Sequence, residues 1–509
     1  MNAYRIKQNP FGIILDAASI VILLITAMGS QAGETPRSGL SVDFKHGALK
    51  VSDNKRFLVH EDSAPFFYLG DTAWELFHRL NRDEAERYLE NRRQKGFTVI
   101  QAVVLAELDG LNTPNAYGEK PLIGNDPAQP NEAYFKHVDF IVKTAEEKGI
   151  FIGMLPTWGD KVVKNAWGKG PVVFSNEKAK IAENYGKFLG GRYKNAPNII
   201  WILIGDRDAK GYEAVWRAMA KGLKEGDGGG HLITVHPAGG RSSSDWFHND
   251  GWLDFNMLQS GHSEFNLPNY EKIVADYSRV PIKPCMDGEP RYEDHPVNWN
   301  PKNGWFDDFD VRQAAYWALF AGAFGHTYGC HDIWQMMAPG RDPISSARNN
   351  WFDALDLPGA WDMLHVRRLL LSRPFLSRIP DQSLIVVDQQ DGAKHIQACK
   401  GDHYAFVYIP YGQSIAINVE KIPWEKCKAW WFDPRTGKAD PIGVLFDREP
   451  KVIALPEEIV RNASKTLYFA RDASMRLFLD PPGKIAHGAD WVLVLDDASQ
   501  NYPPPGEVD

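Results

Sequence analysis

The stretch Trp201-Ile202-Leu203-Ile204-Gly205-Asp206-Arg207 contains the pattern that decides the fold. It is an unbroken apolar run that ends in a glycine and charged residues. A run without polar alternation is typical of a strand buried on both faces, as in a parallel sheet covered by helices. Similar runs recur between residues 66 and 329, and amphipathic helical stretches separate most of them. The sequence therefore predicts a parallel α/β sheet.

The number of strand–helix units predicts how this sheet is arranged. Predicted strands cover 66–71, 97–105, 150–156, 198–204, 231–236, 252–258, 281–286 and 325–329. Predicted helices cover 81–95, 131–148, 176–188, 209–223, 270–277, 311–321 and part of 351–371, with no clear helix after the fifth strand. Eight units over about 300 residues indicate a (β/α)8 TIM barrel. An open doubly wound sheet is the alternative, although no GxGxxG motif follows an early strand.

Beyond residue 372 the pattern changes to short strands between frequent turns. Apolar runs occur at 404–408, 414–419, 428–432 and 491–496. Closely spaced short strands are typical of an antiparallel β-sandwich. We predict a barrel over 40–372, a sandwich over 373–500 and a disordered tail over 501–509, because three successive prolines occur there.

The first 32 residues have the composition of an export signal. Arg5 and Lys7 precede an apolar run over 13–27, which Asp16 interrupts, and small residues follow. The run is too short for a comfortable membrane span, so a cleavable signal peptide is favoured over an uncleaved anchor. We expect a periplasmic or secreted protein with no stable membrane insertion after cleavage.

Charge and aromatic content narrow the class of partner. The 509 residues have a net charge of −8 and show no basic stripe, which disfavours nucleic acid as a partner. The 17 tryptophans suit the apolar faces of sugar rings, although indoles also fill large cores.

The cysteines and the missing metal motifs narrow the chemistry. Four cysteines are too few for a disulfide scaffold, and the pairs Cys285–Cys330 and Cys399–Cys427 or buried free thiols remain open. Neither CxxC nor HExxH occurs, so we expect no metal and no cofactor.

Polar and aromatic side chains gather where the predicted strands end, which is where active sites of such barrels form. In strand order they are Asp71 and Trp74, Glu107, Trp158, Asp206 and Arg207, His236, His262, then Asp287, Glu289 and Arg291, and finally His331. Carboxylates, imidazoles and indoles on one rim suit a polyhydroxylated substrate that is hydrogen-bonded and stacked. The alternative is an ordinary rim of solvated acids and helix caps.

Two of these acids fit glycoside hydrolysis, which needs two carboxyl groups flanking the scissile bond. Asp206 and Glu289 follow strands on opposing arcs of the barrel, and Asp208 and Asp287 compete with them. We prefer Asp206 because it follows closely on the apolar run that ends at Ile204, whereas Asp208 suits a helix cap. We prefer Glu289 because Asp287 lies one layer deeper, where a carboxylate more often orients its neighbours.

The remaining candidates have two interpretations each. Trp74 and Trp158 suit either sugar stacking or core packing, and the three histidines suit recognition of hydroxyl groups. Arg207 or Arg291 could form a bidentate pair with a uronate carboxylate. Equally, they could pair with nearby acids or cap helices.

The segments 66–74, 201–207 and 287–290 resemble the apiosidase-like glycoside hydrolases, family 140. Proteins of that family join a (β/α)8 barrel to a C-terminal β-sandwich named as collagen-binding, which 429–437 and 490–497 resemble. The resemblance implies Asp206 as general acid/base, Glu289 as nucleophile, and a substrate in plant cell-wall polysaccharide: apiose released from the pectic side chains of rhamnogalacturonan II. The insert at 447–480 departs from the family pattern.

Alternatives at this point are an arabinosidase or endo-glycanase on the same scaffold, and a non-catalytic carbohydrate- or collagen-binding protein. We expect a retaining reaction, which places the carboxyl groups about 5–5.5 Å apart, whereas an inverting one needs roughly 6.5–9.5 Å.

Overall fold

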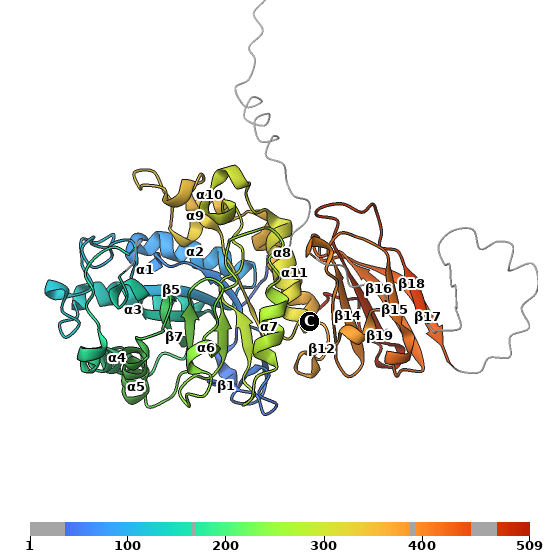
Figure 1. Cartoon of the computed structure of the whole chain (residues 1–509), viewed down its shortest axis with the longest axis horizontal. Helices are drawn as coiled ribbons and strands as arrows, with labels where there is room; N and C mark the ends of the chain where they lie inside the picture. Colours follow the sequence, from blue (N-terminus) through green and yellow to red (C-terminus); the bar gives the residue numbers. More distant parts are fainter. Residues whose placement is uncertain (1–35, 165–167, 387–391, 449–475, 509) are drawn as a thin grey trace, which may run out of the picture. The chain divides into compact units, whose positions relative to one another are not determined.

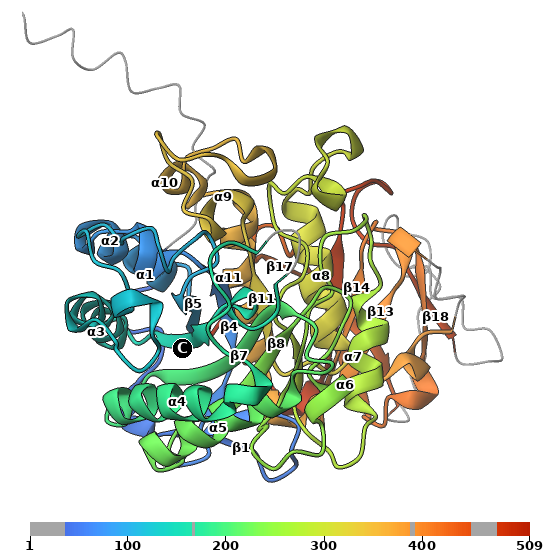
Figure 2. The ribbon, with the colours of Figure 1, turned by 60° about the vertical axis from the view of Figure 1, so that its left-hand side comes forward.

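The computed structural model describes residues 36–164, 168–386, 392–448 and 476–508. The predicted signal peptide and most of the insert at 447–480 lie outside these ranges. Eight parallel strands form the first sheet (Figures 1 and 2). They are β4 (Leu69–Thr72), β5 (Val99–Leu105), β6 (Phe151–Thr157), β7 (Ile199–Arg207), β8 (Ile233–Pro237), β9 (Asn256–Leu258), β10 (Cys285–Asp287) and β11 (His326–Tyr328).

The sheet order β8-β7-β6-β5-β4-β11-β10-β9 brings the two sequence-adjacent edge strands together. The Asp254 N–H, just before β9, donates to the Ile233 carbonyl at the start of β8 over 2.9 Å. The strands thus curl into a barrel, and the predicted fold class is confirmed.

Helices form the outer layer of the barrel, as Figure 2 shows for α2, α3, α4 and α5. The longer ones are α2 (Arg82–Gln94), α3 (Glu132–Glu147), α4 (Ala179–Tyr193), α5 (Glu213–Asp227), α7 (Asn269–Tyr277), α8 (Asp308–Phe320) and α11 (Pro358–Leu371). The shorter ones are α1 (Leu76–Arg79), α6 (Ser244–Phe247), α9 (His331–Trp334) and α10 (Trp351–Ala354). Capping boxes fix the starts of α2, with Asn81 and Glu84, and of α8, with Asp307 and Asp310.

The predicted strand at 66–71 is in fact two strands in different sheets. β3 (Pro65–Phe66) pairs antiparallel with β2 (Leu58–His60), which pairs with β1 (Leu49–Val51). The Phe66 ring contacts Phe151, the first residue of β6, with centroids 5.2 Å apart. The small sheet therefore packs at the N-terminal end of the barrel strands, away from the end that carries the candidate site.

A six-stranded antiparallel sheet and a two-stranded one form the C-terminal domain. The order in the first is β12 (Ile379–Pro380), β13 (Gln397–Lys400), β14 (Tyr404–Ile409), β19 (Trp491–Asp497), β16 (Lys426–Phe432) and β17 (Ala439–Asp447). The second pairs β15 (Ile415–Asn418) with β18 (Arg476–Leu479). Buried side chains of both sheets, including Ile417 and Leu493, share one core, as predicted for a sandwich. All four cysteines of the chain are buried free thiols.

The tail was predicted to be disordered, but the structure places it against the sandwich. The Tyr502 ring lies 4.8 Å from the Arg373 guanidinium, and Arg373 Nη2 donates to the Pro503 carbonyl over 3.0 Å. Prolines lack an N–H group but keep their carbonyls as acceptors, so a buried arginine can anchor such a segment.

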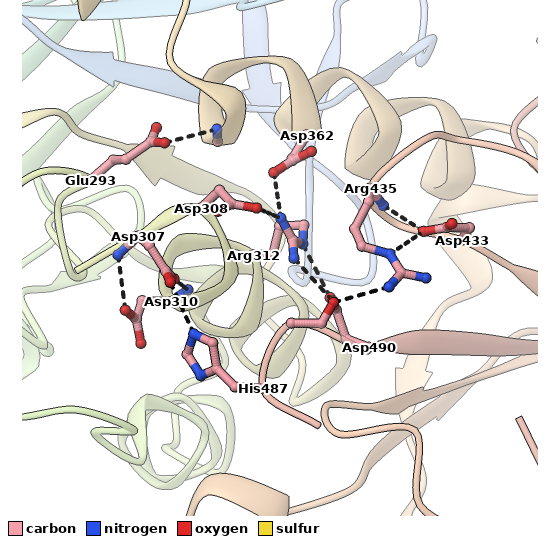
Figure 3. Close-up of polar contacts among 12 residues, drawn as sticks. Glu293, Asp307, Asp308, Asp310, Arg312, Asp362, Asp433, Arg435, His487 and Asp490 are labelled. Atoms are coloured by element: carbon pink, nitrogen blue, oxygen red, sulfur yellow. Dashed lines mark hydrogen bonds and ion pairs between the residues drawn. The ribbon is translucent and has the colours of Figure 1, made fainter. Parts of the chain in front are cut away.

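Helix α8 joins the barrel to the sandwich. Tyr316 stacks on Tyr408 and Phe320 on Phe406, with centroids 4.8 and 5.7 Å apart. Figure 3 shows the Arg312 guanidinium between Asp362 of α11 and Asp490, which precedes β19; the contacts measure 2.7 and 3.0 Å. Stacked rings and a buried ion pair thus connect the two domains.

Candidate active site

The strand β7 ends in a strained bend that presents Asp206. Ile204, Gly205 and Asp206 have φ angles of 76°, 89° and 48°. The pairing with β8 shifts register between Ile204 and Arg207. A left-handed conformation is uncomfortable for isoleucine and aspartate, so surrounding contacts must hold it. Strain of this kind at the end of a barrel strand is typical of a functional position.

Two indoles lie behind this bend. A Cβ atom on Gly205 would lie 2.5 Å from Trp158 Cε3, so the indole packs directly on the glycine. Trp158 and Trp74 are in contact, with centroids 5.1 Å apart, and both also approach the His236 ring. Each is only 2% exposed. Of the two interpretations offered above, packing beneath the site describes their placement.

Three side chains surround the Glu289 carboxylate. His262 Nε2 lies 2.9 Å from Oε1, and Gln259 Nε2 donates to the same oxygen over 3.0 Å. His236 Nε2 lies 3.0 Å from Oε2. These contacts fix the orientation of the carboxylate in a nearly closed setting, with 7% of the side chain exposed.

His236 connects the two acids. The Asp206 backbone N–H donates to His236 Nδ1 over 3.3 Å. Nδ1 accepts this hydrogen bond, and Nε2, on the other side of the ring, faces Glu289. One imidazole thus contacts both the residue predicted as acid/base and the residue predicted as nucleophile.

The two carboxyl groups favour different protonation states. Burial, followed by the charge of Glu289, raises the pKa of Asp206 to about 6. Burial alone would also raise the pKa of Glu289, but contacts with His236 and His262 outweigh it and lower that pKa to about 2. The pair therefore favours one protonated and one ionised carboxyl group in weak acid.

Arg207 and Glu107 lie beside Asp206. Arg207 Nη1 donates to the Asp206 carbonyl over 2.6 Å and lies 3.3 Å from its Oδ2. Burial and then the charges of Glu75 and Asp206 raise the pKa of Glu107 well above its usual value. Asp208, the competitor of Asp206, is exposed.

Asp71 does not reach the site. Its side chain faces the helix layer, where Tyr88 Oη and Arg92 Nε of α2 donate to its Oδ2 over 2.5 and 2.6 Å. It is fully buried in this structural ion pair. Side chains alternate along a strand, so the last residues of β4 cannot all point inward.

Asp287 and Arg291 also point away from the substrate side. Asp287 accepts hydrogen bonds from Ser260 Oγ over 2.6 Å and from Asn269 Nδ2 over 3.1 Å, so it orients the loop that carries His262. Arg291 is 1% exposed and donates to Gln313 Oε1 of α8 over 3.1 Å. Neither side chain is available to a sugar.

Both ring nitrogens of His331 have hydrogen-bond partners within the protein. Its Nδ1 accepts from Trp334 Nε1 over 3.2 Å, and its Nε2 lies 3.1 Å from the Ile344 carbonyl. Its ring centroid lies 4.4 Å from that of His295, whose ring stacks at the same distance on His262. His331 therefore supports the site from behind and does not contact the acids.

Three residues around Glu289 and His262 were not predicted from the sequence: Gln259, Tyr292 and His295. Gln259 directly follows the predicted strand at 252–258, a position that could have identified it. The Tyr292 and His295 rings each lie 4.4 Å from the His262 ring. Both belong to the connection after β10, which the strand pattern does not describe. In the part of the chain that the structure describes, no three His, Cys, Asp or Glu side chains are grouped to hold a metal ion.

A parallel eight-stranded barrel with one carboxyl group that favours the protonated form and one that favours the ionised form, both after the C-terminal ends of its strands, defines a glycosidase of the barrel type. Residues 52–377 match the family model described as the apiosidase-like catalytic domain. Since this match covers well over half of the chain, the protein belongs to the apiosidase-like family. Residues 379–465 match the model described as "Putative collagen-binding domain of a collagenase".

Solved structures agree with this assignment. A protein described as a glycoside hydrolase is 34% identical, with a TM-score of 0.79 over 91% of this chain and 99% of its own. A family 5 glycoside hydrolase from Bacteroides vulgatus is also 34% identical, with a TM-score of 0.79 over 92% of this chain and 97% of its own. No curated protein matches the chain. Within the described ranges, no helix combines the length and apolar character needed to cross a membrane.

Proposed function

We propose that the protein is a retaining glycosidase that releases a terminal, apiose-like sugar from plant cell-wall pectic polysaccharide. Asp206 is the general acid/base and Glu289 the nucleophile. The observation that carries this proposal is the position of the His236 imidazole. It lies 3.3 Å from the Asp206 backbone nitrogen and 3.0 Å from Glu289 Oε2. It thus contacts one residue whose carboxyl group favours the protonated form and one whose carboxyl group favours the ionised form.

The reaction proceeds in two steps. Glu289 attacks the anomeric carbon and forms an ester to the sugar while Asp206 gives its proton to the departing glycosidic oxygen. Esterification removes the negative charge on Glu289, which is one cause of the raised pKa of Asp206. The pKa of Asp206 consequently falls, so Asp206 stays ionised at the same pH and, as general base, takes a proton from water as that water cleaves the ester. Glu289 leaves as a carboxylate, to which His262 and Gln259 return their contacts.

The substrate assignment rests on family membership. The apiosidase-like model covers the barrel, and both carboxyl groups implied by the resemblance are present. An arabinosidase or endo-glycanase on the same scaffold is the second candidate. Export to the periplasm or the medium is proposed from the basic and apolar pattern of the first 32 residues.

The test is the identity of the sugar released from purified rhamnogalacturonan II side chains, compared with arabinan and β-glucan. We expect apiose from the first and nothing from the others. Arabinose or internal oligosaccharides would replace the proposal by the second candidate. Release of no sugar from any glycan that the protein binds would favour a binding protein.

Variants then test the roles of the two acids. Asp206→Asn and Glu289→Gln should each lower sugar release by a factor of at least about 10². Asp208→Asn is the matched control, because this exposed acid lies two residues from Asp206, and it should keep parental activity. Proton NMR of the first product should show the same anomeric configuration as the substrate, and inversion would overturn the retaining mechanism.

A further inference from the structure

Trp299 differs from the other indoles near the site because it is open to solvent. It is 48% exposed, whereas Trp74 and Trp158 are each 2% exposed. It lies in the long connection between β10 and α8, directly after Asn298, which is also exposed. Because about half of this residue stays exposed, burial alone does not account for its position.

The backbone holds Trp299 in an uncomfortable conformation. Asn298 and Trp299 have φ angles of 52° and 59°, and a bulky side chain rarely adopts the left-handed region. The Asn298 N–H donates to the His262 carbonyl over 2.7 Å, and the Val297 N–H donates to the Gly304 carbonyl over 3.0 Å. The connection is thus tied to the loop that carries His262. Strain that specific contacts maintain at a half-exposed side chain points to function.

Trp299 is close to the nucleophile. Its ring centroid lies 4.4 Å from that of His295 and 5.9 Å from that of His262. The Nε2 atom of His262 lies in turn 2.9 Å from Glu289 Oε1. His236 Nε2 lies at the other carboxylate oxygen, Oε2, and the His236 ring in turn accepts a hydrogen bond from the Asp206 backbone N–H. Trp299 therefore belongs to the Glu289 side of the acid pair.

We propose that Trp299 is the stacking platform for the sugar ring on the nucleophile's side of the scissile bond. An indole face matches the apolar C–H face of a sugar, and a rigid backbone limits the entropy lost on binding. The exposed amides of Asn298 and Asn300 lie next to it in the chain, where sugar hydroxyls need partners. The ligand is thus a carbohydrate ring with one apolar face. This inference rests on the proposed function, because it takes Glu289 as the nucleophile.

The test compares Trp299→Ala and Trp299→Phe with the parent in the full chain. The substrates are the oligosaccharide that the parent cleaves and an aryl glycoside of the released sugar. Trp299→Ala should lower kcat/KM roughly tenfold or more on both substrates, mainly through KM, and Trp299→Phe should recover part of the loss. Phe478→Ala is the control, because Phe478 is 49% exposed but lies on β18 of the sandwich, and it should behave as the parent.

Two further measurements separate stacking from an indirect effect through His262. The pH profile of Trp299→Ala should match that of the parent, because a platform does not alter the charge of Glu289. Quenching or a shift of tryptophan fluorescence by the released sugar should occur in the parent and be reduced in Trp299→Ala.

Three outcomes overturn the platform. They are a kcat/KM within twofold of the parent, a displaced pH profile, or an unchanged fluorescence response in Trp299→Ala. If the parent cleaves no glycan, the proposed function fails instead; the fluorescence response to added apiose, compared between the parent and Trp299→Ala, then still reports on Trp299 alone.

Discussion

At the scale of single residues, the Asp206–Glu289 pair sets how activity depends on pH. The first step requires protonated Asp206, with a pKa raised to about 6, and ionised Glu289, with a pKa lowered to about 2. Activity should therefore rise as pH increases through the lower value and fall as it increases through the upper one. The measurement is kcat/KM against pH on the natural linkage. A profile that stays flat from pH 5 to 8 would contradict the proposed protonation states.

The leaving group separates the role of Asp206 from that of Glu289. An aryl glycoside with an acidic phenol leaves without a proton, so Asp206→Asn should form the sugar ester on it and then stall before hydrolysis. On the natural linkage the same variant should lose roughly 10²- to 10⁴-fold in rate. Stopped-flow release of the phenol should show a burst for Asp206→Asn and none for Glu289→Gln. Equal losses on both substrates would show that Asp206 does not protonate the leaving group.

The sequence could place Asp206 but not all its partners. Asp206 follows the apolar run after a single glycine, whereas Asp208 is exposed, and the choice between them stays a prediction. At β10 the strand ends at Asp287, so Glu289 already belongs to the connection that follows. Asp287 binds Ser260 and Asn269 while Glu289 binds His262, so two acids two residues apart serve different neighbours. Only the folded connections show which side chains meet there.

At the scale of elements, the bend at the end of β7 depends on Gly205. An added Cβ would meet Trp158 Cε3 at 2.5 Å, and the φ of 89° already disfavours any other residue. Gly205→Ala should lower the free energy of unfolding by about 2–4 kcal/mol and displace Asp206, with loss of activity. Urea unfolding and kcat/KM are the measurements.

Gly211→Ala is the matched control for this bend. Gly211 has a φ of 82° in the same connection, but a Cβ there would meet nothing within 4 Å. It should cost about 1 kcal/mol and leave activity intact. If the two variants behaved alike, backbone strain and not the contact with Trp158 would control the bend.

Element boundaries were predictable where one physical signal dominated. The apolar strands and the cap at Asn81 mark their elements directly in the sequence. Residues 66–71 were predicted as one strand because their hydrophobicity indicates burial. Phe66 of β3 and the residues of β4 are indeed buried, but the two strands belong to different sheets. The helix after β7 starts at Glu213, four residues later than predicted, because β7 continues to Arg207.

At the scale of the whole molecule, α8 links the nucleophile's loop to the sandwich. Arg291, two residues after Glu289, donates to Gln313 Oε1 of α8 over 3.1 Å. Gln313 Nε2 donates in turn to the Ala393 carbonyl in the C-terminal domain over 3.1 Å. The sandwich thus packs on the helix that supports the connection carrying Glu289. Loosening the domain interface should consequently affect the barrel as well as the sandwich.

Two ion pairs across this interface differ in burial and allow that expectation to be tested. Arg312 and Asp490 have side chains 1% and 0% exposed, whereas His487 and Asp307 are each 50% exposed (Figure 3). Asp490→Ala leaves a buried guanidinium without this partner and removes the acceptor of Tyr408 Oη. It should therefore cost about 3–5 kcal/mol of unfolding free energy. His487→Ala removes a solvated contact and should cost less than about 1 kcal/mol.

The measurement is urea unfolding followed by two signals. Loss of activity reports on the barrel, and total fluorescence reports on the whole chain. In Asp490→Ala we expect both transitions to move together. If activity kept its parental midpoint while fluorescence shifted, the barrel would not depend on the sandwich, because α8 would then hold the nucleophile's connection without support from the second domain.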